Sequence, residues 1–103
     1  MMRIRLSRNA ATFLKGEKRY LEQFNPRAAE TVLRQLRDAL RLLSEYPQAG
    51  ISDGLLDGRR RFISGDYVIH YRVEGMLLQI SHIRHGRQLP PGLEKDEDLP
   101  EDR

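Results

Sequence analysis

Arginine and histidine side chains are concentrated in one stretch, residues 59–87, where their spacing decides what chemistry they can share. Two short turn signals, Gly65-Asp66 and Glu74-Gly75, separate runs rich in β-branched and aromatic residues, which is typical of a three-stranded antiparallel meander. Because side chains alternate between the two faces of a strand, the meander predicts one apolar and one basic face. The basic face is expected to carry no Asp or Glu and to hold Arg59, Arg61, His70, Arg72, His85 and Arg87.

These side chains are suited to binding a polyanion or an acidic protein surface. Arginine pairs its N–H donors with phosphate or carboxylate oxygens, and a neighbouring histidine can act as an acid or base near pH 7. The alternative is a basic face that only meets solvent, but a solvated face normally mixes charges of both signs. We therefore expect this face to bind the target of the protein.

Other site chemistries find little support in the sequence. His82 and His85 have the spacing of a metal-ligand pair, but residues three apart on a strand point to opposite faces, so we expect no metal site. His82 is instead expected at the edge of the core. Ser64 and Ser81 lack the context of a catalytic nucleophile, and the chain has no cysteine and no Gly-rich phosphate loop. We expect no cofactor and no covalent catalysis.

The two turns also predict which residues pair across the meander. We expect a loop at Glu74-Gly75 to pair Val73 with Met76, Tyr71 with Leu78, Ile69 with Ile80 and Tyr67 with His82. We expect a loop at Gly65-Asp66 to pair Ser64 with Tyr67, Phe62 with Ile69 and Arg60 with Tyr71. Both sets of pairs describe the apolar face, which must be covered by other elements.

Those elements precede the meander. Residues 3–6 alternate with period two and predict a short strand, whose arginines extend the basic face. Ser7 is a favourable N-cap for a helix that extends to Phe24, and Asn25-Pro26 predicts a second helix that ends near Tyr46. The apolar stripes of two helices joined so closely must pack against the apolar face of the sheet. Residues 49–58 then read as a loop with two Asp-Gly turn signals.

Length and charge divide the chain into a body and a tail. The 103 residues fit a single domain, and no apolar run is long enough to cross a membrane, so we expect a cytoplasmic protein without a membrane partner. Residues 1–88 hold 16 Lys/Arg and 9 Asp/Glu, a net charge of +7, whereas residues 89–103 hold 2 and 6, a net charge of −4. The acidic tail is expected to be mobile, either solvated or folded over the basic face.

Residues 3 to about 88 resemble the RelE/ParE superfamily of type II toxin–antitoxin toxins. The resemblance is carried by Arg61 and by residues 42–50, 65–73 and 83–87, which include Tyr46-Pro47, Gly65-Asp66-Tyr67 and His85-Gly86-Arg87. It implies a single α+β domain over residues 1–88 with the order β-α-α-β-β-β and a helical hairpin on one face of an antiparallel sheet. It also implies a cognate antitoxin that neutralises the toxin.

The branch of the superfamily decides the target. The His85-Gly86-Arg87 segment and the leucine-rich end of the second helix resemble ParE-like toxins, which poison DNA gyrase by binding and need no catalytic residue. The alternative is a RelE-like endoribonuclease that cleaves mRNA on the ribosome, for which Arg61, His85 and Arg87 are the candidate catalytic residues. Val68 occupies the position where that branch carries an arginine, so we favour gyrase. A second alternative is a non-toxic binding module on the same fold.

Overall fold

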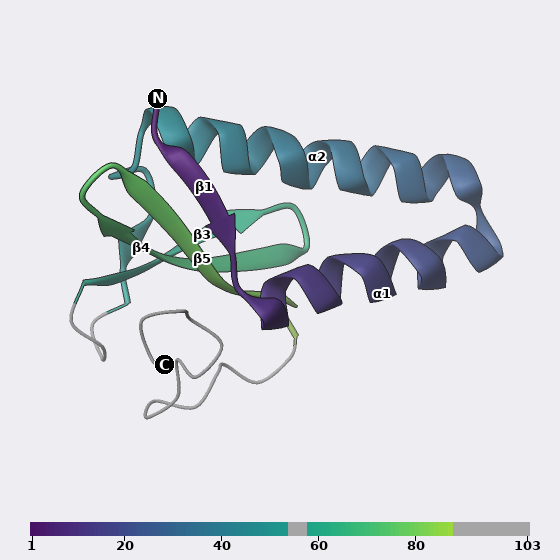
Figure 1. Cartoon of the computed structure of the whole chain (residues 1–103). Helices are drawn as coiled ribbons and strands as arrows, with labels where there is room; N and C mark the ends of the chain where they lie inside the picture. Colours follow the sequence, from purple (N-terminus) through teal and green to yellow (C-terminus); the bar gives the residue numbers. More distant parts are fainter. Residues whose placement is uncertain (54–57, 88–103) are drawn as a thin grey trace.

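The computed structural model describes residues 1–53 and 58–87, so the predicted acidic tail and Asp57 lie outside the described residues. The elements follow in the order β1 (Arg3–Leu6), α1 (Arg8–Phe24), α2 (Pro26–Glu45), β2 (Ile51–Ser52), β3 (Arg59–Ser64), β4 (Tyr67–Glu74) and β5 (Leu77–His85). The strands form one mixed sheet in the order β1-β5-β4-β3-β2. The antiparallel helices lie together on one side of this sheet (Figure 1), as the α+β prediction requires. The opposite, open face carries the residues of interest.

Both helices begin where their caps predict. The Ser7 hydroxyl accepts from the Ala10 N–H at 3.0 Å and donates to the Ser81 carbonyl at 2.6 Å, which also fixes the start of α1 to β5. The Asn25 Oδ1 accepts from the backbone N–H groups of Arg27 and Ala28, and Pro26 takes the first helical position. These contacts occupy N–H groups that a helix start otherwise leaves without a partner.

The core lies between the helical hairpin and the apolar face of the sheet. It comprises Ala10, Leu36, Ala39, Leu40, Leu43, Tyr67, Ile69, Tyr71, Leu78, Ile80 and Ile83. Tyr71 is fully buried, and its hydroxyl donates to the Pro47 carbonyl at 2.7 Å and accepts from the Gly50 N–H at 2.9 Å. This pair of bonds fixes the chain where it leaves α2 and approaches β2. Part of the expected loop 49–58 therefore forms a short strand, β2, which pairs Ile51 with Arg61.

The predicted register holds for β3 and β4 but not for β4 and β5. Ser64 pairs with Tyr67, Phe62 with Ile69 and Arg60 with Tyr71, as expected. Between β4 and β5, however, Glu74 pairs with Leu77, Val73 with Leu78 and Tyr71 with Ile80. The two-residue loops are Gly65-Asp66 and Gly75-Met76, so in each loop the glycine comes first, with φ 60°. A hairpin loop with glycine first suits the twist of the strands, and the prediction had placed Gly75 second.

A second difference arises in the middle of the β4–β5 pair. The register shifts between His70 and Tyr71, so that Tyr71 pairs with Ile80 but His70 pairs with His82. Ser81 is therefore an extra residue, a β-bulge, and its hydroxyl donates to the His70 carbonyl at 3.1 Å. Beyond Ser81 every side chain of β5 changes face relative to the prediction. Ile83 and His85 point to the helices, and His82 lies on the open face.

Candidate functional site

The open face of the sheet brings together four of the six predicted binding residues. Arg59 pairs with Arg72, and Arg61 pairs with His70, so these four share a face as expected. His85 does not join them, because the bulge turns it toward α1. Arg84 takes its place on the open face, across from Val68. Arg87 follows the end of β5.

His70 is buried on this face and bonded through both ring nitrogens. It is only 2% exposed. Its Nε2 accepts from the Arg84 Nε–H at 3.1 Å, because an arginine can only donate. The proton of the neutral ring therefore lies on Nδ1, which donates to the Asp53 carboxylate at 3.2 Å. Burial lowers the pKa of His70 to about 4, against the opposing effect of Asp53 and with help from Arg84 and Arg59. Near pH 7 this histidine is neutral, and both of its ring nitrogens are occupied.

The open face carries carboxylates, contrary to the prediction. Asp53 directly follows β2, and its N–H donates to the Arg59 carbonyl of the neighbouring strand β3. Its other carboxylate oxygen pairs with the Arg61 guanidinium at 3.3 Å. At the far end, Glu74 lies 3.7 Å from Arg72 and accepts from the Gln79 amide at 2.6 Å. The prediction was wrong because it considered only the strands and placed Glu74 in a loop. Asp53 partly neutralises the centre of the face.

His85 belongs to a separate cluster between α1 and the end of the sheet. Its Nε2 lies 2.8 Å from the Glu17 carboxylate, which also accepts from the Tyr67 hydroxyl at 2.6 Å. The rings of Tyr67 and His85 lie against each other, and the Phe13 ring meets both of them edge-on. Burial, followed by Glu17, raises the pKa of the Tyr67 hydroxyl, which stays protonated as a donor. The sequence predicts that His85 binds the target; in the structure it contacts α1 through Glu17 and also lines the pocket at the end of the sheet.

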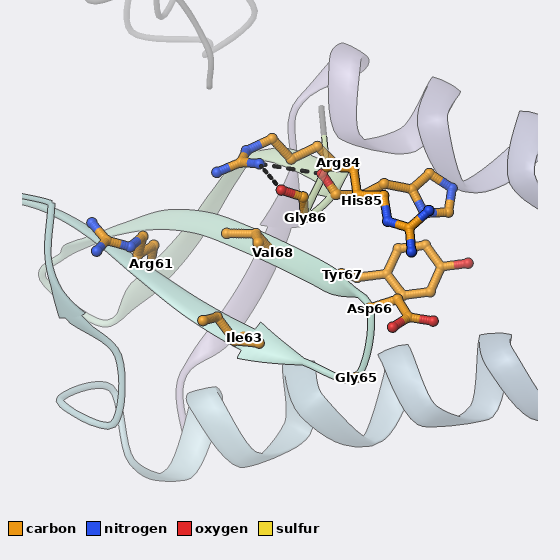
Figure 2. A pocket seen from close by; sticks show the side chains of 10 residues that line it. Arg61, Ile63, Gly65, Asp66, Tyr67, Val68, Arg84, His85 and Gly86 are labelled. Atoms are coloured by element: carbon orange, nitrogen blue, oxygen red, sulfur yellow. Dashed lines mark hydrogen bonds between the residues drawn. The ribbon is translucent and has the colours of Figure 1, made fainter. Parts of the chain in front are cut away.

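An open pocket of about 800 Å³ lies at the end of the sheet, where the Gly65-Asp66 loop meets the end of β5. Ile63 and Val68 form an apolar floor, and three of the lining residues are arginines, Arg61, Arg84 and Arg87. In Figure 2, Val68 lies between the side chains of Arg61 and Arg84, while the His85 ring lies beside Tyr67. The pocket combines cationic groups with apolar surface, so it suits an anionic ligand that also carries an apolar group.

Arg84 organises this end of the sheet. Its Nη1 donates to the carbonyls of His85 and Gly86, at 3.2 and 3.4 Å, while its Nε holds His70. The Gly86 N–H in turn donates to the Asp66 carbonyl at 2.8 Å. These bonds fix the backbone of His85 and Gly86, directly before Arg87, which lines the pocket. The sequence prediction missed Arg84 because the bulge that brings it to this face leaves no mark in the alternation.

Across residues 1–53 and 58–87, no three His, Asp or Glu side chains lie close enough together to hold a metal ion. Neither described helix is both long and apolar enough to span a bilayer.

Comparison with known proteins identifies the family. Residues 4–90 match the family described as the ParE toxin of type II toxin-antitoxin system, parDE. The chain belongs to this family. Toxin RelE2 of Caulobacter vibrioides is 37% identical over 71 residues, which are 68% of this chain and 78% of that protein. A chain of the chromosomal ParDE TA system from P. aeruginosa superposes with a TM-score of 0.67 at 23% identity, covering 82% of this chain and 96% of that one. This last likeness concerns the fold alone.

The chain is thus a RelE/ParE superfamily toxin of a type II toxin–antitoxin system. In this ParE-family toxin, Val68, the residue that led us to favour gyrase from the sequence, lies on the floor of the pocket. Arg61 and Arg87, two of the three candidate nuclease residues, line the same pocket. The third, His85, also lines it but is bound to Glu17.

Proposed function

We propose that this toxin acts on DNA gyrase by binding, without a catalytic residue, and that a cognate antitoxin neutralises it. The family match supports the ParE branch, because it covers residues 4–90. The observation that carries the proposal is the state of two histidines: His70 of the predicted basic face, and His85, the histidine among the candidate nuclease residues. His70 lies between Asp53 and Arg84, and His85 is engaged by Glu17.

General acid–base catalysis needs a side chain that can exchange a proton with the substrate. His70 is buried and neutral, and its Nε2 lone pair already accepts from Arg84. Val68 also cannot stabilise the charge of a scissile phosphate, a contribution typically worth about a hundred- to a thousandfold in rate. Binding through the cationic groups of the open face and the pocket requires neither property.

The ribosome-dependent ribonuclease is the second candidate, favoured by the 37% identity to Toxin RelE2. Its acid–base chemistry would use His85, which lines the pocket beside Glu17, or His82, which lies on the open face with its ring edge-on to His70 at 6.3 Å. His85→Ala and His82→Ala test the two candidates. Loss of mRNA cleavage in either variant would identify the catalytic histidine of a nuclease, whereas a gyrase inhibitor has no cleavage to lose.

The antitoxin proposal rests on charge and on the structural neighbour. The body carries a net charge of +7, which favours an acidic partner and predicts binding that weakens with salt. The structural neighbour comes from a ParDE toxin–antitoxin system. Co-expression with the product of the adjacent gene should give a complex at low salt. If none forms, the proposed partnership fails.

Two assays on the purified toxin decide the target. We expect inhibition of gyrase supercoiling with accumulation of cleaved DNA, and intact mRNA on translating ribosomes. Arg61→Ala and Arg87→Ala should weaken the inhibition, whereas Arg34→Ala, on the exposed side of α2, is the control. Codon-position cleavage of mRNA with gyrase unaffected would instead establish the ribonuclease. If the protein neither inhibits gyrase nor cleaves mRNA but still binds the antitoxin, it is the non-toxic binding module.

A further inference from the structure

The pocket at the end of the sheet exposes an unusual combination of side chains. Ile63 is 65% exposed, although it lies on a strand between Arg61 and the Gly65-Asp66 loop. Arg61 retains 36% side-chain exposure, and only its Nη1 faces Asp53. Arg87 is exposed at the pocket wall. The lining holds three arginines against one carboxylate, Asp66, around an apolar floor, which favours an acidic segment that carries large apolar side chains.

The chain itself contains such a segment immediately after the pocket. Residues 89–103 hold 6 Asp/Glu against 2 Lys/Arg, and Leu89, Leu93 and Leu99 are spaced among them. The acidic run at residues 94–98 begins seven residues after Arg87, a stretch that spans at most about 23 Å at ~3.3 Å per residue. Since Arg87 is part of the pocket wall, this length of chain suffices to return to it.

We propose that the acidic C-terminal segment, residues 89–103, binds in cis to the pocket formed by Arg61, Ile63, Val68 and Arg87 and covers it in the free toxin. Its carboxylates meet the arginines, and its leucines cover the Ile63–Val68 floor. The short link makes this contact intramolecular, with an effective concentration in the millimolar range. Any other acidic ligand of the pocket therefore has to displace the tail first. This inference holds whether the toxin acts on gyrase or on the ribosome.

A charge-matched pair of full-length variants tests the proposal. The tail variant carries Glu94→Gln, Asp96→Asn, Glu97→Gln and Asp98→Asn. The control carries Glu22→Gln, Glu30→Gln, Asp38→Asn and Glu45→Gln, four exposed positions on α1 and α2. Both sets raise the net charge equally, so a difference between them reports position and not total charge.

The probe is a fluorescent peptide with the sequence of residues 89–103, and its binding is followed by anisotropy at low salt. We expect the tail variant to bind the peptide at least about tenfold more tightly than the native toxin, because its own tail no longer competes. The control should bind like the native toxin. Equal affinity of the native toxin and the tail variant would overturn the proposal.

The position of the contact is tested in the tail variant. Arg87→Ala and Ile63→Ser, both at exposed side chains, should each weaken peptide binding severalfold, whereas Arg34→Ala on α2 should leave it unchanged. Peptide binding that is insensitive to Arg87 and Ile63 would place the tail elsewhere and refute the pocket as its site. Circular dichroism verifies that each variant is folded.

Amide NMR separates binding in cis from binding to a second copy. Between the native toxin and the tail variant, shift differences are expected at Gly65, Asp66, Val68 and Gly86, which surround the pocket. Under the proposal we expect these differences to be the same at roughly 20 and roughly 500 μM protein, because an intramolecular contact does not depend on the protein concentration. Differences that disappear on dilution would assign the contact to the tail of another molecule and overturn its intramolecular character.

Discussion

The Arg84 guanidinium donates its Nε proton to the Nε2 of His70 at 3.1 Å, on the open face of the sheet. Burial, with a smaller contribution from the Arg84 charge, lowers the pKa of His70 and keeps the ring neutral, while Asp53 accepts from the opposite ring nitrogen. The interaction joins three segments that are distant in sequence, the residues before β3, the middle of β4 and the end of β5. Both ring nitrogens of His70, a candidate general base, are thus used in hydrogen bonds within the protein.

The first prediction is that acid destabilises the toxin through His70. The pKa of His70 is about 4 in the folded toxin against an ordinary value of 6.5. As the pH falls, His70 is protonated in the unfolded chain before it is protonated in the folded toxin. The contribution of His70 to the free energy of unfolding is therefore present above pH 6.5 and is lost as the pH drops toward 4. From pH 6.5 to 5, where most carboxylates remain ionised, we expect a loss of about 2 kcal/mol. Urea unfolding at both pH values measures it.

His70→Gln provides the control for this titration. The variant removes the titrating ring, so its stability should change much less than that of the native toxin over the same pH range. An unchanged pH dependence in His70→Gln would assign the acid sensitivity to other groups.

The second prediction concerns Asp53. Asp53→Ala leaves the Nδ1 proton of His70 buried without its acceptor, which typically costs about 1–3 kcal/mol of stability. The same change releases Arg61 from its ion pair and removes the negative charge from the centre of the open face. Retention on heparin should therefore increase while stability decreases. Asp38→Ala, on the exposed side of α2, changes the net charge equally and should alter stability little.

The third prediction is that Glu17 and Tyr67 stabilise the fold jointly. Glu17 is buried and accepts from the Tyr67 hydroxyl at 2.6 Å. Glu17→Ala and Tyr67→Phe should each destabilise, and a double-mutant cycle should give a coupling free energy of about 1–3 kcal/mol. Additive effects of the two changes would show that the bond contributes nothing to stability. Denaturant titration of the four proteins completes the cycle.

The fourth prediction contrasts three glycines that look alike in the sequence. Gly16→Ala should stabilise the toxin by up to about 1 kcal/mol, because alanine has the higher helix propensity and the added Cβ would contact no other part of the protein. Gly75→Ala should cost about 1–2 kcal/mol, because φ is 60° at this position. Gly50→Ala should be severe, because its Cβ would lie 2.6 Å from the Tyr71 hydroxyl. Thermal unfolding ranks the three variants, and any other order would contradict the placement of these glycines.

The elements whose cause is local could be predicted from the sequence. Ser7 and Asn25 start the two helices through bonds to backbone groups two or three residues away. The Gly65-Asp66 loop set the β3–β4 register, because a two-residue hairpin leaves the strands only one close pairing. Arg59, Arg61, His70 and Arg72 could for the same reason be placed on one face from their alternation alone.

Only the tertiary structure determined on which face of the sheet Asp53 and the residues after Ser81 lie. The bulge at Ser81 is supported by contacts with Ser7 and His70, which are distant in sequence, so the alternation of β5 could not reveal it. One extra residue moves every later side chain to the other face, which brought Arg84 to His70 and gave His85 to Glu17. Asp53 reached the open face because it follows β2 and its N–H donates to the Arg59 carbonyl, a pairing that no periodic pattern records. Composition and local spacing determined that this protein has a basic sheet face, and long-range packing determined which of its charges remain available for binding.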